Sequence, residues 1–92
     1  MFASIRRYRL ERGSMEELER RVDEGFAEEI GRQPGFVAYE FMDCGDGEII
    51  TLSVFRVADQ AEASREFAQR WTEENAIRSR SRERGGMVDR FV

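Results

Sequence analysis

Residues 34–57 form two runs of alternating side chains joined by the turn CGDG at positions 44–47. Alternation with a period of two is typical of β-strands, and Asp-Gly is a strong hairpin signal because glycine readily adopts positive φ. The two sides of the first run consist of Phe36, Ala38, Glu40 and Met42, and of Val37, Tyr39, Phe41 and Asp43. The two sides of the second run consist of Ile50, Leu52 and Val54, and of Ile49, Thr51, Ser53, Phe55 and Val57. This pattern predicts a β-hairpin that carries large apolar side chains on both faces.

A stripe of apolar residues at spacings of three and four precedes the hairpin. It consists of Met15, Leu18, Val22, Phe26 and Ile30. Such spacing is typical of an amphipathic helix, and Ser14 followed three residues later by Glu17 forms a capping box at its start. A helix is therefore predicted over residues 14–31, and Pro34-Gly35 ends it.

A second helix is predicted after the hairpin. Asp59 with Glu62 three residues later is a variant of the same capping box, and the apolar stripe consists of Ala63, Phe67 and Trp71. The helix is expected to reach the region of Ile77. The polar run RSRSRER at residues 78–84 is interpreted as a frayed helix end or a loop.

The two ends of the chain predict outer strands. Residues 2–10, FASIRRYRL, are rich in β-forming side chains, and residues 87–92, MVDRFV, alternate weakly after Gly85-Gly86. The order of elements is then βαββαβ. With right-handed crossovers this order predicts a single domain over residues 1–92, of the α+β, ferredoxin-like class: a four-stranded antiparallel sheet with two helices on one face.

The face of the sheet opposite the helices has a consequence for assembly. A solvated sheet face is normally polar along every strand, yet both faces of this hairpin are apolar. We therefore expect a homodimer in which a second copy of the sheet packs face to face at about 10 Å. The alternative is a monomer with scattered exposed apolar residues.

Composition excludes several kinds of chemistry. The chain of 92 residues has no histidine, and all 15 basic residues are arginine. This excludes histidine-based acid–base catalysis, histidine-ligated metal and haem, and lysine Schiff bases. The net charge of −4 argues against nucleic acid as a partner.

No apolar run approaches the ~20 residues of a membrane span, and arginines interrupt the N-terminal segment where a signal peptide would be apolar. A single cysteine, Cys44, cannot form an internal disulfide. The expected location is therefore the cytoplasm, with no membrane partner.

Several sequence segments together resemble a known family. They are IRRYRL, RGSMEEL, QPGFVAYEF, the Asp-Gly turn, TLSVF, DQAEA and WTEEN. In this order they resemble the antibiotic-biosynthesis-monooxygenase-like proteins of the dimeric α/β-barrel superfamily, over essentially the whole chain. The most specific pieces, the capped helix at Ser14 and Pro34-Gly35-Phe36, are structural.

The resemblance implies a dimer with a small pocket in each subunit. Some members of the family oxidise aromatic polyketides with O₂ and without a cofactor. The implied function is a cofactor-independent monooxygenase acting on a small aromatic or polyketide-like substrate, with no metal. The alternative is a non-catalytic barrel protein that binds a small hydrophobic ligand or has a role in stress.

The resemblance also points to candidate substrate-binding residues, namely Trp71, Asn75, Tyr39 and Tyr8. Trp71 would stack on a flat ligand or belong to the core, and Asn75 would orient a hydroxyl or cap the helix. The tyrosines would donate hydrogen bonds to an oxyanion or simply pack at a rim. The chain departs from the characterised enzymes, because it lacks their histidine and its tryptophan precedes its asparagine. No catalytic residue is assigned.

One carboxylate in the hairpin has two interpretations. Glu40 lies in an otherwise apolar strand. Buried, it would have a raised pKa and act as a base. On an edge strand it would be a solvated residue that discourages aggregation.

Overall fold

The computed structural model describes residues 1–75, 77–79 and 84–88. Its strands are β1 (Phe2–Leu10), β2 (Phe36–Asp43), β3 (Glu48–Phe55), β4 (Ile77–Ser79) and β5 (Arg84–Met87). Its helices are α1 (Met15–Arg21), the π-helical turn η1 (Val22–Phe26), α2 (Ala27–Gly31) and α3 (Ala58–Glu74). Among these described helices, none is long and apolar enough to cross a membrane.

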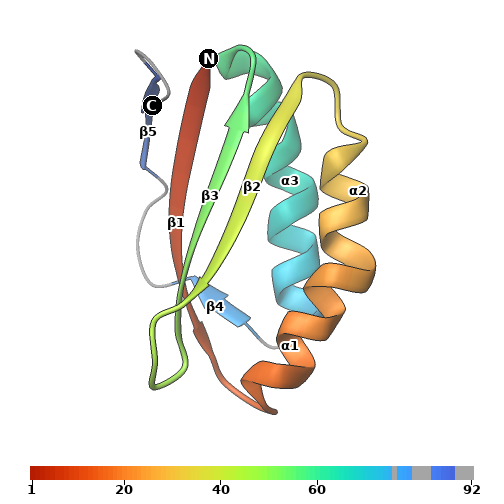
Figure 1. Ribbon diagram of the computed structural model, residues 1–92, viewed down its shortest axis with the longest axis vertical. Helices are drawn as coiled ribbons and strands as arrows, with labels where there is room; N and C mark the ends of the chain where they lie inside the picture. The colour runs from red at the N-terminus through yellow and green to blue at the C-terminus, as the bar shows by residue number, and fades with distance from the viewer. Residues whose placement is uncertain (76, 80–83, 89–92) are drawn as a thin grey trace.

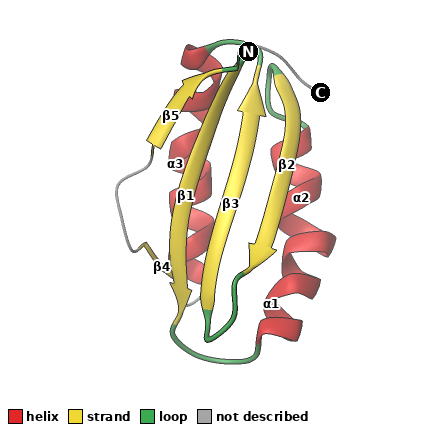
Figure 2. Ribbon diagram, turned by 60° about the vertical axis from the view of Figure 1, so that its left-hand side comes forward, coloured by secondary structure: helices red, strands yellow, loops and turns green. Residues whose placement is uncertain are grey.

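The strands form one antiparallel sheet in the order β2-β3-β1-β4, and β5 pairs with the same edge of β1 as β4 does. The continuous helix α1–η1–α2 and helix α3 lie side by side on one face of the sheet (Figure 1). Figure 2 shows the opposite face, which no helix covers. The predicted α+β, ferredoxin-like fold with two helices on one face is confirmed.

The C-terminal part of the fold differs from the prediction. Helix α3 ends at Glu74, Ile77 belongs to β4, and the last described strand begins at Arg84 and not at Met87. The remainder of the predicted strand, residues 89–92, lies outside the described residues. The predicted start was wrong because the edge of β1 offers backbone hydrogen-bonding groups to any sequence, polar or not. Gly85 fits into this strand because glycine has no side chain. The ring of Phe2 occupies the space that a side chain at this position would need.

The first long helix owes its π turn to the spacing of its apolar residues. Ser14 caps it as predicted, since its side chain accepts a hydrogen bond from the Glu17 amide at 3.2 Å. From Leu18 onward the buried side chains recur every four residues, and in a regular α-helix of about 3.6 residues per turn three such steps would rotate the stripe by about 120°. The wider turn at η1 rotates it back. As a result Leu18, Val22, Phe26 and Ile30 are all buried against the sheet.

The start of α3 also differs from the prediction. The helix begins at Ala58, so Asp59 lies inside the first turn and is not the N-cap. Its first turn is tied by Gln60, whose Oε1 accepts a hydrogen bond from the Val57 amide at 3.3 Å. Asp59 still suits this position, because a negative charge is favourable near a helix N-terminus.

Both faces of the hairpin follow the predicted alternation except at its two ends. Val57, predicted to continue the second run, lies beyond the end of β3 and is exposed. Ile49, Thr51, Ser53 and Phe55 are buried on the helix side, and Tyr39 and Phe41 lie opposite Ser53 and Thr51. A register shift between Phe36 and Ala38 turns Phe36 to the helix side as well, where its ring meets that of Phe55 edge-on at 5.9 Å. The prediction that Phe36 shares a face with Ala38 was therefore wrong, because simple alternation cannot reveal a β-bulge.

Candidate functional site

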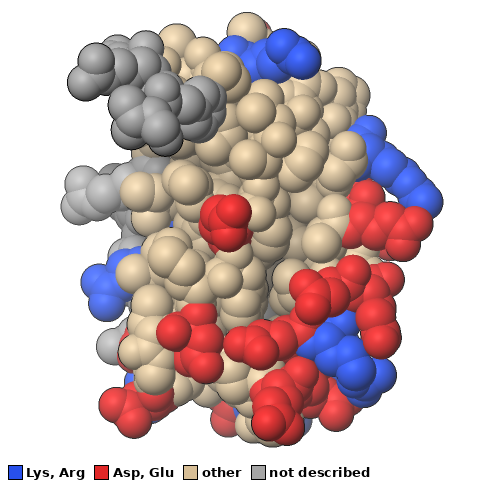
Figure 3. Space-filling view, in the orientation of Figure 1, with Lys and Arg blue, Asp and Glu red and all other residues tan. Residues whose placement is uncertain are grey.

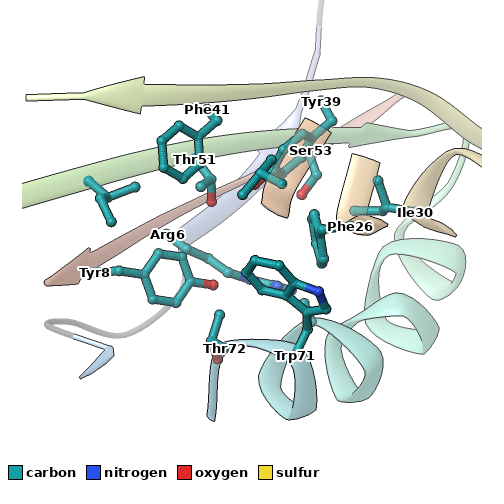
Figure 4. Close-up of a pocket in the computed structure, with 13 residues that line it drawn as sticks. Arg6, Tyr8, Phe26, Ile30, Tyr39, Phe41, Thr51, Ser53, Trp71 and Thr72 are labelled. Carbon is teal, nitrogen blue, oxygen red and sulfur yellow. The ribbon is translucent and has the colours of Figure 1, made fainter. Parts of the chain in front are cut away.

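A pocket lies between the helix-facing side of the sheet and the two helices (Figure 4). Its lining residues come from β1, β2, β3, the η1–α2 segment and α3. They are Arg6, Tyr8, Val22, Phe26, Ile30, Tyr39, Phe41, Ile49, Thr51, Ser53, Ala68, Trp71 and Thr72. The space that the centre of a water molecule can reach in this pocket is about 20 Å³, and the whole volume between the lining atoms, open solvent included, is about 400 Å³. The water-accessible space has room for about one or two waters, so a ring-sized ligand would also need the part that is open to solvent.

The pocket has a polar floor, which the strand register explains. Phe41, Thr51 and Arg6 lie opposite one another across β2, β3 and β1. The neighbouring row of the same face consists of Tyr39, Ser53 and Ser4. Tyr8 lies two residues beyond Arg6, and thus on the same face of β1. The sheet therefore presents one guanidinium and several hydroxyl groups toward the helices.

The roof of the pocket is aromatic and centres on Phe26. The ring of Phe26 lies 5.1 Å from Tyr39, 5.4 Å from Phe67 and 5.1 Å from Trp71, measured between centroids. Phe26 and Phe67 are stacked, and the other two pairs are tilted. These are favoured geometries for aromatic pairs. The roof can thus contact the flat ring of a ligand while the floor contacts the polar groups of the same ligand.

The electrostatic environment settles the protonation state of Tyr39. Burial raises the pKa of its hydroxyl far above the usual value of 10.0, Tyr8 raises that pKa further, and the charge of Arg6 lowers it in part. Tyr39 is therefore a neutral phenol over the whole physiological pH range. In that state it can donate a hydrogen bond to a developing oxyanion, but it cannot serve as a phenolate base.

The structure brings three of the four predicted binding residues together. Tyr8, Tyr39 and Trp71 all line the pocket (Figure 4). Asn75 does not line it. Its Nδ2 donates to the carbonyl of Trp71 at 2.8 Å, and its Oδ1 accepts from Arg21 at 3.3 Å. Asn75 thus holds the end of α3 and borders a separate hollow next to the β1–α1 connection.

Sequence reasoning missed the polar groups of the floor, above all Arg6. Considered with Tyr8, two residues away, Arg6 belongs to the inward side of β1, and this spacing was the available signal. The other arginines of this region lie elsewhere: Arg7 and Arg56, which follows β3, are exposed, and Arg9 pairs with Glu48 at 2.7 Å. Glu40 is exposed on the helix-free face of edge strand β2, so it does not reach the pocket and is not a buried base there.

Comparison with known proteins places this geometry in context. No family model and no curated protein sequence matches the chain. The solved structures that resemble it over most of their length include three proteins. SnoaB, a cofactor-independent oxygenase from Streptomyces nogalater, is 21% identical with a TM-score of 0.73, and the match covers 99% of this chain and 95% of SnoaB.

The second structure is protein Atu4242 from Agrobacterium tumefaciens, which is 28% identical with a TM-score of 0.65 and coverage of 99% and 96%. The third is named "Putative antibiotic biosynthesis monooxygenase" from Nitrosomonas europaea, and is 16% identical with a TM-score of 0.60 and coverage of 94% of both chains. The two proteins with an oxygenase name are below 25% identity, a level at which the likeness establishes a shared fold. The resemblance to the antibiotic-biosynthesis-monooxygenase-like proteins is therefore confirmed at the level of fold, over nearly the whole chain.

Proposed function

We propose that this chain is a cofactor-independent monooxygenase that acts on a small aromatic or polyketide-like substrate, with residues 1–92 forming a single domain of that kind. The observation that carries the proposal is the pocket itself, which is lined both by the phenols Tyr8 and Tyr39 and by the aromatic rings of Phe26 and Trp71. The fold shared with SnoaB, itself a cofactor-independent oxygenase, supports it.

The chemistry suits a substrate with an acidic methylene group next to an aromatic carbonyl. Loss of a proton forms an enolate, which is electron-rich enough to reduce O₂ directly. The methylene then becomes a carbonyl, one oxygen atom of O₂ enters the product, and the other leaves as water. Neutral Tyr39 would donate to the enolate oxygen, and the described residues that line the pocket include no carboxylate or imidazole to act as base.

The test is oxygen consumption with a panel of hydroxylated anthrones and quinols. We expect Tyr39→Phe to lower kcat/KM by about 10²-fold, the effect of removing one oxyanion donor, while the ring and the melting temperature are retained. Trp71→Phe keeps an aromatic roof and is expected to have a much smaller effect. Oxygen uptake no faster than without protein, for every compound, would contradict the proposal.

A second function is favoured by the lining of the pocket, which is largely aliphatic and aromatic. In this alternative the chain is a non-catalytic dimer that binds a small hydrophobic ligand. Trp71 is the only tryptophan of the chain and lines the pocket, so its fluorescence reports occupancy. Quenching of that fluorescence by an aromatic compound, without oxygen uptake, would favour this alternative.

We also propose that the helix-free face of the sheet forms a homodimer interface. Ile5 and Met42 are 47% and 43% exposed on that face, and Ile50 and Leu52 lie between them on β3. Figure 3 shows acidic side chains gathered toward α1 and α2. The helix-free face also carries the charged residues Arg7 and Glu40. The exposed apolar residues of such a face are more stable when a second copy covers them.

Sedimentation tests the dimer. We expect a species of twice the 10.8 kDa chain mass at micromolar concentration, and a monomer for Ile5→Asp, because the aspartate would bury a charge between the sheets. Val57→Asp is the matched control, since Val57 is equally exposed, at 51%, but follows β3 and lies outside the sheet. A wild-type species of 10.8 kDa would refute the interface.

A further inference from the structure

The pocket has one feature that the proposed oxidation does not by itself require. Arg6 is the only charged residue among the described residues that line it. It stands in the middle of β1, opposite Thr51 and between the rows that contain Tyr39 and Tyr8. Figure 4 shows its side chain extending below the sheet toward the space between Tyr8 and Trp71. The arginine therefore belongs to the binding surface and not only to the strand.

The charge of Arg6 reaches the groups that a ligand would contact. Its charge lowers the pKa of Tyr39 in part, although burial and Tyr8 outweigh it, so the guanidinium acts on one hydroxyl of the pocket floor. Much of the remaining lining is aliphatic or aromatic. In such surroundings an opposite charge within about 4–6 Å commonly shifts an ionisation by one to three pH units.

We propose that Arg6 makes this pocket selective for the ionised form of a flat hydroxylated ligand, held with its oxygen-bearing edge against the sheet. The ligand class is a planar phenolate or enolate. Its oxygen would lie near Arg6, Tyr8 and Tyr39, and its hydrocarbon edge would lie against Phe26 and Trp71. The reverse orientation would place the anion against the electron-rich faces of the aromatic rings and away from the guanidinium of Arg6.

This inference rests on the proposed function in one respect, since the ligand is taken to be the substrate. It explains how a pocket whose described lining contains no carboxylate or imidazole can favour proton loss. Stabilising the enolate relative to the neutral substrate lowers the ligand's own pKa, so water suffices to accept the proton. Arg6 is then a specificity-determining residue that selects the form of substrate that reacts with O₂.

The experiment titrates a bound nitrophenol, a single-ring phenol whose ionised form absorbs visible light. Absorbance is followed against pH with and without excess protein, in the absence of oxygen. For the wild type we expect the bound compound to ionise at least one pH unit below the free compound, which corresponds to about tenfold tighter binding of the anion. For Arg6→Gln we expect that difference to vanish or change sign. Arg7→Gln removes the same charge from the opposite face of β1 and should behave as the wild type.

Several outcomes would overturn the inference. One is a bound nitrophenol that ionises at or above the pH of the free compound in the wild type, a result that needs no variant to fold. Another is an equal effect of Arg6→Gln and Arg7→Gln. Arg6→Lys, which keeps the charge, should retain part of the shift, and its complete loss would count against a role for charge.

The titration involves no turnover, so the two proposals fail separately. If the bound nitrophenol ionises at a lower pH than the free compound but no oxygen is consumed, the result supports anion selection and contradicts the monooxygenase. Oxygen uptake that Arg6→Gln leaves unchanged supports the monooxygenase and contradicts anion selection.

Discussion

Phe26→Ala is expected to lower the free energy of unfolding by about 3–5 kcal/mol, the range for removing a large aromatic side chain from a core. Phe26 is 4% exposed, and its ring contacts Tyr39, Phe67 and Trp71. Alanine would leave a void under α3 and break all three aromatic contacts. Because domains of this size are stable by roughly 5–15 kcal/mol, the variant would lose a large part of its stability.

Urea denaturation measures the loss, with Trp71 fluorescence as the probe. Phe67→Ala is the matched control, because Phe67 is only partly buried and makes one of the three contacts. Its cost should be clearly smaller. If Phe26→Ala cost no more than Phe67→Ala, the aromatic cluster would not be centred on Phe26 in solution.

Gly35→Ala is expected to cost about 2–3 kcal/mol, from two separate causes. Gly35 has φ of +76°, a conformation that costs an L-residue about 1–2 kcal/mol. A methyl group at this position would also fall on the side-chain amide of Gln60. Gln60 would have to move, and its hydrogen bond from the Val57 amide at the start of α3 would be lost at a cost of about 1 kcal/mol.

The two causes can be separated by comparing variants. Gly13 also has positive φ, +84°, but nothing lies within 4 Å of the position where its side chain would be. Gly13→Ala should therefore show the backbone cost alone. In a Gln60→Ala background, Gly35→Ala should also fall to that cost. If the cost of Gly35→Ala were the same with and without Gln60, the contact between them would not contribute.

Much of the fold followed from local patterns. The hairpin turn is encoded by Gly45, Asp46 and Gly47, which all have positive φ in the structure, and the first helix by its Ser14 cap. These signals act over a few residues and do not depend on distant parts of the chain. The bulge at Phe36 and the two short strands on β1 have no such signal, because they arise from the pairing of segments far apart in the sequence.

The candidate site shows the same division. Tyr8, Tyr39 and Trp71 were candidates because of the family resemblance, and the structure brings them to one pocket. Asn75, only four residues from Trp71, caps the helix instead, because the last turn of α3 leaves carbonyl groups that need donors. The polar floor depends on the pairing register of β1, β2 and β3, because this register decides which residues lie next to one another across the strands. No single stretch of residues specifies it.

By itself, the sequence determined the order of elements from the first strand to the second helix, the capped first helix, the hairpin turn and the presence of apolar groups on both faces of the sheet. Each of these depends on spacing within one segment, where a side chain's direction is set by the local backbone. Only the tertiary structure decided that Arg6 faces the aromatic roof while Arg7 faces away, and that Glu40 stays on the exposed face. The physical reason is register: a shift of one residue in strand pairing exchanges the two faces, and long-range packing selects between them.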